Sequence, residues 1–360
     1  MSSPLPQRAT IGVIGGGQLG RMLCIAAARL GFRTHVFAPE HDAIAGQVAN
    51  QTTKAEYSDA VAMREFAESV DVTTFEFENI PAEVLEVLEE RGAVFPPRRA
   101  LAVSQDRLVE KTFLRDAGLK TAAFATVDDE QSLLAALDVV GVPAILKTRR
   151  LGYDGRGQVR ILDRSQAVEA AGALDNTPCL LESVVDFRCE ISVIAARSHD
   201  GKTVCFEPGE NLHTDGILRT TTVPARVSDD ERKAAIDIGK RIVDAFDYVG
   251  VMGVELFVTD DGILVNEIAP RVHNSGHWTL DGCVIDQFEQ HIRAVAGWPL
   301  GDGSRHSNVV MTNLIGEDVS DLDVVTHAPA VALHLYGKAD VRAGRKMGHF
   351  TRVTGPAESS

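Results

Sequence analysis

Two glutamates, Glu255 and Glu267, stand in apolar stretches on either side of an Asp261-Gly262 step. Such a step between apolar runs predicts a β-hairpin, and counting outward from it places Glu255 opposite Glu267 to within one residue. Facing carboxylates in apolar strands repel each other. A hard divalent cation would remove that repulsion, so the pair predicts a Mg²⁺ site completed by substrate phosphates, with Asn266 as a further polar group. A solvent-facing pair on an edge hairpin is the alternative.

A lysine and a glycine-rich loop form a second candidate site. Lys147 lies near the end of an expected strand over 144–148, and the loop over 149–157 holds three glycines. Such a loop can fold its N–H groups over a polyphosphate while the lysine neutralises phosphate charge. It lacks the GxxxxGK[ST] spacing of a P-loop. The alternative is a surface hairpin whose glycines serve turn geometry alone.

A dense run of polar side chains follows Glu267. Residues 271–279 include one arginine, two histidines, an asparagine and a serine. Donors packed this closely beside a metal-binding strand are typical of a substrate-binding loop. One isolated histidine would more often be structural.

The glycine turn over 15–20 fits the pattern GxGxxG, after an expected strand and before an expected helix. Glycines let a phosphate approach the backbone at a helix N-terminus. A dinucleotide site also needs an acidic residue at the end of the second strand, but this strand ends at Pro39 and the nearest acid is Glu40. The turn therefore disfavours NAD. A phosphate of another ligand and a turn that only packs helix on sheet both stay open.

The first hundred residues alternate between strand and helix patterns, which predicts βαβ units and a parallel sheet. A Pro-Pro step at 96–97 ends this pattern. The rest of the chain is richer in strands, and its tail is expected to hold short ones. The expected strands are 10–14, 34–37, 71–77, 93–95, 144–148, 158–162, 179–183, 190–196, 203–207, 250–259, 262–268 and 331–336. The expected helices are 21–30, 59–69, 81–91, 106–117, 229–246 and 285–296.

The chain of 360 residues carries 36 Lys+Arg against 51 Asp+Glu, a net charge of -15. The electric field of this net negative charge repels polyanions. It therefore argues against nucleic-acid and membrane-surface binding but not against small phosphorylated ligands. The five cysteines show no metal-ligand spacing and no disulfide framework. No apolar run reaches transmembrane length, and the start lacks a signal peptide. We expect two or three domains of a cytoplasmic enzyme.

Taken together, these motifs resemble the ATP-grasp superfamily, and within it the ligases that carboxylate an aminoimidazole ribonucleotide. The resembling segments run through nearly the whole chain: 15–21, 74–79, 105–107, 152–158, 210–213, 266–278 and 337–349. The runs GYDGRGQ and NEIAPRVHNSGHW are the specific ones. The resemblance implies an α/β and α+β architecture. It consists of an N-terminal Rossmann-like parallel-sheet domain over 1–105, a small ATP-grasp lobe over 106–186, and a large lobe with the C-terminal tail over 187–360.

The implied reaction joins bicarbonate to the exocyclic amine of 5-aminoimidazole ribonucleotide, with ATP as co-substrate and carboxyphosphate as intermediate. The implied metal is Mg²⁺, with Mn²⁺ as a substitute, and the implied assembly is a homodimer. The departure at 206–210, FEPGE before the NLH motif, leaves that motif intact.

The resemblance also implies roles residue by residue. Those for ATP are Arg107, Lys147, Gly152, Tyr153, Asp154, Gly155, Arg156, Gly157, Gln158, Glu182, Ser183, Val184, Val185, Glu190, His213, Asn266 and Glu267. Those for the ribonucleotide are Gln18, Leu19, Glu76, Tyr153, Asp154, Arg156, Asn274, Lys338 and Arg345. The metal ligands are Glu255 and Glu267, and the catalytic residues are Arg271, His273 and Lys338. Two choices stay open: whether Glu76 or Glu78 contacts substrate, and whether His273 handles a proton or orients the amine.

Three other interpretations remain. A different ATP-grasp ligase, such as a formate-dependent glycinamide ribonucleotide transformylase or a biotin carboxylase, would use another acid or acceptor. An NAD(P)-dependent oxidoreductase rests on the glycine turn alone. A nucleotide sensor would bind ATP without turnover, which the intact pair of Glu255 and Glu267 disfavours.

Overall fold

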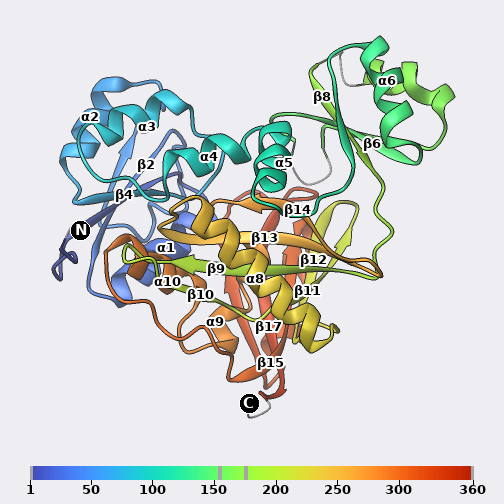
Figure 1. Cartoon of the computed structure of the whole chain (residues 1–360). Coiled ribbons are helices and arrows are strands. Elements are labelled where there is room, and N and C mark those ends of the chain that lie inside the picture. The colour runs from blue at the N-terminus through green and yellow to red at the C-terminus, as the bar shows by residue number, and fades with distance from the viewer. Residues whose placement is uncertain (1–2, 153–155, 174–176, 358–360) are drawn as a thin grey trace.

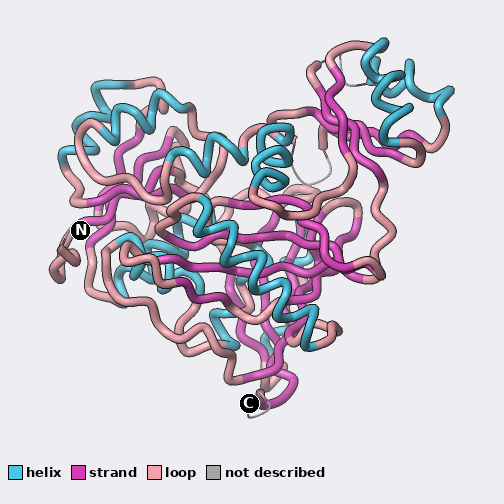
Figure 2. The backbone as a smooth tube through the Cα atoms, viewed as in Figure 1, coloured by secondary structure: helices cyan, strands magenta, loops and turns pink. Residues whose placement is uncertain are grey.

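The computed structural model describes residues 3–152, 156–173 and 177–357. Its strands form three sheets, of four, nine and four strands. Figure 1 shows the first two sheets packed into one body, with the third in a lobe that projects from it. Figure 2 shows helices lying against the faces of these sheets.

Sheet A, the N-terminal sheet, is entirely parallel. Its side chains alternate between two faces: Val13 and Val36 pack with the helix α1 (Gln18–Arg29), while Ile14 and Phe37 pack with α2 (Ala60–Glu68) and α3 (Ala82–Glu89). The expected Rossmann-like βαβ domain is therefore confirmed. The expected strand over 93–95 is reduced to one bridge at Val94. The strand order is β3 (Gln51–Lys54), β2 (Arg33–Ala38), β1 (Thr10–Ile14), β4 (Val72–Phe75).

Sheet C forms the projecting lobe and is antiparallel. Two helices, α6 (Glu130–Val140) and α7 (Ala167–Ala173), share its small apolar core. Helix α6 begins at a capping box in which the side chains of Asp129 and Ser132 bond each other's backbone. The strand order is β5 (Phe124–Val127), β8 (Cys179–Ser183), β6 (Ala144–Thr148), β7 (Gln158–Ile161).

Sheet B is the central sheet, and all its pairs are antiparallel. Its strand order is β14 (Gly262–Ala269), β13 (Gly250–Thr259), β9 (Cys189–Arg197), β11 (Gly209–Thr214), β12 (Ile217–Val223), β15 (Ser307–Ile315), β17 (Lys346–Pro356), β16 (Val331–Leu335). The short strand β10 (Thr203–Cys205) pairs with β9.

Helices cover both faces of sheet B. On one face, Val193 shares a core with α4 (Arg98–Ser104), α5 (Arg107–Asp116) and α8 (Asp229–Ala245), and α8 runs across the strands in Figure 1. On the other face, Ile194 packs with α1 and α10 (Gln287–Val295). The N-terminal domain is thus anchored to sheet B through α1. Two further helices, α9 (Thr279–Gly282) and α11 (Asp323–Thr326), are short.

The α1–α10 contact is also held by charge. Arg29 on α1 pairs with Asp286 at 2.7 Å and with Glu289 at 3.0 Å, and both carboxylates are nearly buried. Arg29 thus bridges two acids of α10 with its two terminal nitrogens, and these charge-assisted bonds help to hold α1 against α10. No helix among the described residues is long and apolar enough to cross a membrane.

Several expected elements have the observed bounds, among them the strands over 144–148, 179–183 and 250–259. The tail differs from expectation: β15 and β17 are long and pair with each other in the central sheet, where only short strands were expected. The α-helices and strands not expected from the sequence are β3, α4, β5, α6, α7, β11, β12, α9, β15, α11 and β17.

Candidate active site

A cleft of about 630 Å³ opens where the three sheets meet. Gln18 on α1 and Glu76 just after β4 reach it from the N-terminal domain, Lys147 from sheet C, and the Glu255 and Glu267 pair from sheet B. The expected site residues that line it are Gln18, Leu19, Glu76, Arg107, Lys147, Gly152, Gln158, Glu190, His213, Glu255, Asn266, Glu267, Arg271, His273 and Asn274.

Other expected site residues lie elsewhere. Arg156, Gly157, Glu182, Ser183, Val184, Val185, Lys338 and Arg345 are not among the lining residues. Tyr153, Asp154 and Gly155 fall outside the described residues, so their expected contacts are not placed. Lining residues that the sequence did not single out include Glu110, Arg149, Phe187, Phe257 and Lys346.

The hairpin of β13 and β14 places Glu255 directly opposite Glu267, as the turn predicted. The pairing is set by a bulge: near the turn Leu256 faces Val265, and one extra residue, Asn266, intervenes before Glu255 meets Glu267. A bulge bends its strand and re-aims side chains, and such bulges are frequent beside active sites. Without it, Glu255 would face Asn266 and the two carboxylates would be offset.

The two carboxylates respond differently to their surroundings. Burial, reinforced by the charge of Glu267, raises the pKa of Glu255 from 4.5 to about 8. Burial alone would also raise the pKa of Glu267, but the positive charges of Arg107 and Lys147 outweigh it and lower that pKa. Of these two carboxylates, Glu255 is therefore the one that lacks a compensating cation.

These residues fit a hard divalent cation. Two facing carboxylates supply oxygen ligands, and the amide of Asn266 lies beside them in the cleft. No cluster of three or more acidic, histidine or cysteine ligands occurs in the described part of the chain. Mg²⁺ is commonly held by one or two carboxylates plus substrate phosphates, so the protein's two are sufficient when nucleotide supplies the rest.

Helix α5 supports the bulged strand with three side chains. Arg107 pairs with the Glu267 carboxylate at 3.1 Å. Glu110 accepts the Ile268 N–H at 2.7 Å, and the Lys111 ammonium donates to the Asn266 carbonyl at 2.6 Å. Glu110 and Lys111 are almost fully buried, and burial with the charge of Glu267 raises the pKa of Glu110 to about 8. Helix α5 thus bonds two backbone groups in and next to the bulge, on the edge strand β14.

A buried chain of charges links α5 to the projecting lobe. The Glu182 carboxylate pairs with Lys147 at 2.9 Å and with Lys111 at 3.6 Å. Burial alone would raise the pKa of Glu182, but the two lysines outweigh it and lower that pKa. The side chain of Glu182 therefore fixes lysines and does not itself line the cleft.

Two aromatic rings and an acid–imidazole pair lie on another wall. Phe187 and Phe257 stack with centroids 4.8 Å apart. Glu190 bonds the His213 imidazole at 2.6 Å. Burial alone would lower the pKa of His213, but Glu190 and then the nearby charge of Glu255 outweigh it and raise that pKa. This wall combines a flat apolar surface with a polar pair, which suits a nucleoside.

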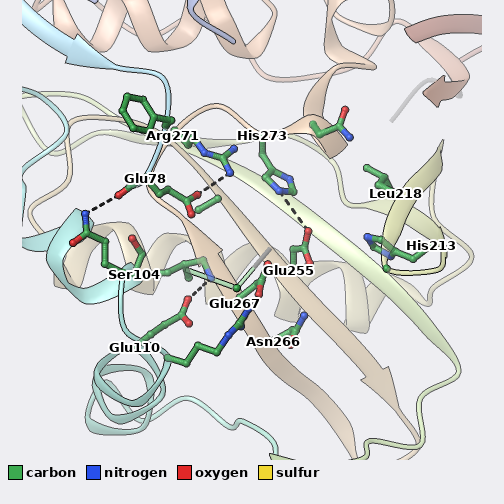
Figure 3. Close-up of a pocket in the computed structure, with 18 of the residues that line it drawn as sticks. Glu78, Ser104, Glu110, His213, Leu218, Glu255, Asn266, Glu267, Arg271 and His273 are labelled. Carbon is green, nitrogen blue, oxygen red and sulfur yellow. Dashed lines mark hydrogen bonds and ion pairs between the residues drawn. The ribbon is translucent and has the colours of Figure 1, made fainter. Parts of the chain in front are cut away.

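The polar loop after β14 faces the carboxylates. Arg271 pairs with Glu78 at 2.8 Å, and His273 Nε2 lies 3.4 Å from Glu255 Oε1; Figure 3 shows both side chains directed this way. Burial, reinforced by the charge of Arg271, lowers the pKa of His273 well below its ordinary value. Asn274 lines the cleft, and neither polar atom of its amide has a hydrogen-bond partner among the described residues.

The glycine turn holds one of the protein's own carboxylates. Glu76 accepts the N–H groups of Gly17 at 2.7 Å and Gly20 at 3.0 Å. A Cβ at Gly15 would lie 2.5 Å from the Glu76 side chain, so glycine is needed for this approach. The idea that these amides bind a ligand phosphate is therefore wrong for Gly17 and Gly20, because Glu76 occupies them.

The choice between Glu76 and Glu78 gains a geometric basis. Glu76 organises the turn beside Gln18 and Leu19, while Glu78 is committed to Arg271. Both glutamates line the cleft. Each glutamate thus holds a neighbouring group of the protein while it lines the cleft.

The tail contributes a different lysine from the expected one. Lys346 lines the cleft, and the Lys338 ammonium donates to its carbonyl at 2.7 Å. Burial, reinforced by the charge of Arg345, lowers the pKa of Lys338 to about 8. Arg345 itself donates to the Asp340 carbonyl. Lys338 and Arg345 thus stand behind the wall that Lys346 forms.

The chain is similar to known proteins both in sequence and in structure. Three family models match: the ribonucleotide synthetase preATP-grasp domain over 8–105, the ATP-grasp domain over 112–288, and the phosphoribosylaminoimidazole carboxylase C-terminal domain over 309–359. An N5-carboxyaminoimidazole ribonucleotide synthase of Brucella melitensis is 52% identical over 96% of each chain.

The chain is also similar to solved structures over nearly its whole length. An N5-carboxyaminoimidazole ribonucleotide synthetase in complex with ADP superposes with a TM-score of 0.95 at 40% identity, covering 98% of this chain and 94% of that one. A synthase from Aspergillus clavatus in complex with ADP and 5-aminoimidazole ribonucleotide superposes with a TM-score of 0.91 at 30% identity, covering 97% and 94%.

Proposed function

The chain belongs to the N5-carboxyaminoimidazole ribonucleotide synthase family of ATP-grasp ligases, and we propose that its cleft unites ATP, bicarbonate and 5-aminoimidazole ribonucleotide. The enzyme carboxylates the exocyclic amine of the ribonucleotide and releases ADP and phosphate. One observation carries the assignment of the site. The bulged hairpin sets Glu255 against Glu267 in the cleft, with Arg107 and Lys147 beside them.

ATP lies between sheet C and sheet B in this proposal. The base stacks near Phe187 and Phe257, and the pair of Glu190 and His213 meets the ribose. Arg107 and Lys147 meet the phosphates, and the residues 152–158 cover them, with Gly152 and Gln158 already in the lining. In the transition state the transferred phosphoryl group is only loosely bonded, and negative charge is spread over its equatorial oxygens. Fixed cations beside those oxygens therefore stabilise the transfer.

Glu255, Glu267 and Asn266 would hold Mg²⁺. When bound, the ion would neutralise phosphate charge and supply the cation that the raised pKa of Glu255 indicates is missing. Mn²⁺ can replace it in a site made only of oxygen ligands.

Bicarbonate lies beside Arg271, whose guanidinium matches a planar anion. Bicarbonate oxygen takes the γ-phosphoryl group of ATP and gives carboxyphosphate, which hydrolyses readily in water. The loop over 152–158 would therefore serve to exclude water during transfer. Asn274 offers its unpartnered amide to one of the substrates.

The ribonucleotide lies toward the glycine turn, against Gln18 and Leu19, with Glu76 below them. Tyr153, Asp154, Arg156, Lys338 and Arg345 belong to the same expected set. Its amine attacks the carboxyl carbon of carboxyphosphate, the bond from that carbon to the phosphate oxygen breaks, and the departing phosphate takes the amine proton. Lys338 acts on this reaction indirectly. Its ammonium donates a hydrogen bond to the carbonyl of Lys346, and Lys346 lines the cleft.

The test is an ADP-release assay with each acid and acceptor. We expect turnover with bicarbonate and 5-aminoimidazole ribonucleotide and none with formate and glycinamide ribonucleotide; the reverse would contradict the assignment. Glu267→Gln should abolish Mg-dependent turnover while the far-ultraviolet circular dichroism spectrum stays unchanged. Normal ADP formation by that variant would remove the metal assignment.

A homodimer in the cytoplasm completes the proposal, as the resemblance implies. Light scattering on the purified chain measures its mass in solution. A mass of one chain at working concentration would contradict the dimer.

A further inference from the structure

A buried glutamine at the start of α10, Gln287, hydrogen-bonds both the backbone N–H and the backbone carbonyl of His273, a residue that lines the cleft. Gln287 is fully buried. Its Oε1 accepts the His273 N–H at 2.9 Å, and its Nε2 donates to the His273 carbonyl at 2.8 Å. A backbone N–H can only donate and a carbonyl can only accept, so the orientation of this amide is fixed.

The second hydrogen on Gln287 Nε2 has one further contact, His277 Nδ1 at 3.0 Å. Because the amide nitrogen donates, Nδ1 must accept and carries no proton. A neutral imidazole has one N–H, so the proton of His277 lies on Nε2. Burial, followed by the charge of His273, lowers the pKa of His277 well below its ordinary value, which keeps the ring neutral.

His273 has its tautomer set in the same sense. Its Nδ1 accepts the Ser275 N–H as a helix cap and lies 2.8 Å from the Ser275 hydroxyl. Ser192 bonds that hydroxyl at 2.7 Å from the neighbouring strand β9. The free N–H of His273 is therefore also on Nε2, the atom nearest Glu255.

We propose that Gln287 is a positioning residue that makes His277 an N–H donor and holds the backbone of His273, whose tautomer Ser275 sets, so that the bicarbonate end of the cleft has two N–H donors and no imidazole proton acceptor. Both imidazoles line the cleft beside Arg271. Two neutral donors beside an arginine stabilise negative charge that develops on carboxyphosphate oxygens and cannot take the amine proton. This inference rests on the proposed carboxylation and decides the role of His273, which the sequence left open.

The packing around Gln287 supports a dedicated position. A Cβ at Gly276 would lie 2.6 Å from Gln287 Oε1, so the polar loop comes as near to this amide as glycine allows. The Gln287 N–H is bonded by Thr279 Oγ1 at 3.0 Å, and that hydroxyl donates to the Gly276 carbonyl at 2.7 Å. The amide, the loop and the start of α10 therefore form one hydrogen-bonded unit.

The same helix supplies a matched control. Gln290 is also fully buried, and it clamps the backbone of Gly301 with the same two bonds: its Oε1 accepts the N–H and its Nε2 donates to the carbonyl, each at 2.8 Å. Gly301 does not line the cleft. Gln287→Glu and Gln290→Glu therefore make the same chemical change in similar burial, but only the first touches a cleft histidine.

The decisive measurement is the ¹⁵N spectrum of the histidine side chains in the full chain, with His277 assigned from His277→Asn. We expect wild-type His277 to be protonated at Nε2. An ionised glutamate at 287 cannot donate, so in Gln287→Glu the proton should move to Nδ1. We also expect kcat to fall roughly 10- to 100-fold with KM for ATP unchanged, because a donor to developing charge is lost. Gln290→Glu should change neither the tautomer nor kcat.

Three results would overturn the inference. The first is a wild-type His277 protonated at Nδ1, which needs no variant and so decides the matter even if Gln287→Glu fails to fold. The second is a tautomer switch with unchanged kcat. The third is an equal loss of kcat in both variants, which would indicate a general effect of disturbing α10. Wild-type ADP release dependent on bicarbonate tests the proposed function separately, so its failure is distinguishable from these.

Discussion

Glu255→Gln tests the metal assignment without relying on turnover. In metal-free protein, burial and Glu267 raise the pKa of Glu255 from 4.5 to about 8. Its folded-state pKa thus exceeds the unfolded one. The stabilising contribution is complete below about pH 4.5 and is lost as pH rises through about 8. Each pKa unit corresponds to about 1.4 kcal/mol, so the shift gives a ceiling of about 5 kcal/mol; the side chain is only 17% exposed, so solvent screens little of it.

The size of the thermal shift follows from the length of the chain. Unfolding entropy of about 2 cal/mol/K per residue gives roughly 0.8 kcal/mol/K for 360 residues. We expect the Tm of the wild type in EDTA to fall by up to about 6 °C more than that of Glu255→Gln between about pH 5 and pH 9. Glu65→Gln, at an exposed position on α2, is the control and should follow the wild type.

Mg²⁺ and ADP supply the second half of this test. Together they should restore the Tm of the wild type at high pH and stabilise Glu255→Gln much less, because the variant lacks the Glu255 carboxylate whose charge the ion neutralises and keeps only Glu267. Parallel Tm profiles of the two proteins in EDTA would refute the electrostatic reasoning. Equal stabilisation of both by Mg²⁺ and ADP would refute the metal assignment.

Two further changes probe the supports of the cleft. Glu182→Gln leaves Lys111 and Lys147 without their buried carboxylate, so urea denaturation should show a loss of about 3–5 kcal/mol. Because the folded-state pKa of Glu182 is lowered, its contribution is present above its unfolded pKa and lost as pH falls through the folded one; the variant should lack this acid dependence. In Gly17→Ala the new Cβ would lie 2.5 Å from Glu76 Oε1, so the turn must shift. Steady-state kinetics should then show a higher KM for the ribonucleotide with KM for ATP unchanged; a change in KM for ATP alone would contradict the placement.

The hairpin shows how far local sequence reaches. The Asp261-Gly262 step and its apolar flanks predicted both strands and the pairing of Glu255 with Glu267 to within one residue. The bulge at Asn266 that fixes this pairing has no local signal. Backbone groups in and next to it are bonded by Glu110 and Lys111 on α5, more than 150 residues earlier in the chain. Turn chemistry is local, whereas a bulge depends on what packs behind it.

The missed elements divide in a similar way. Helix α6 carried a readable signal, because Asp129 and Ser132 stand at capping-box spacing before its apolar residues. Strand β17 did not: it includes two glycines and a proline, which local propensity reads as loop. It is a strand because β15 and β16 pair on either side of it. Partners distant in sequence decided the structure there.

Basic residues line the cleft, but much of their positive charge is balanced by acids of the protein. Several of its cations are held by acids: Arg107 by Glu267, Lys147 by Glu182, Arg149 by Asp106, and Arg271 by Glu78. Such pairing explains how a chain with a net charge of -15 keeps fixed cations at an anion site without a ligand. It also sets a condition on binding. Arg107 would exchange Glu267 for phosphate oxygens when that carboxylate turns to Mg²⁺, so nucleotide and metal should strengthen each other's binding by the same factor.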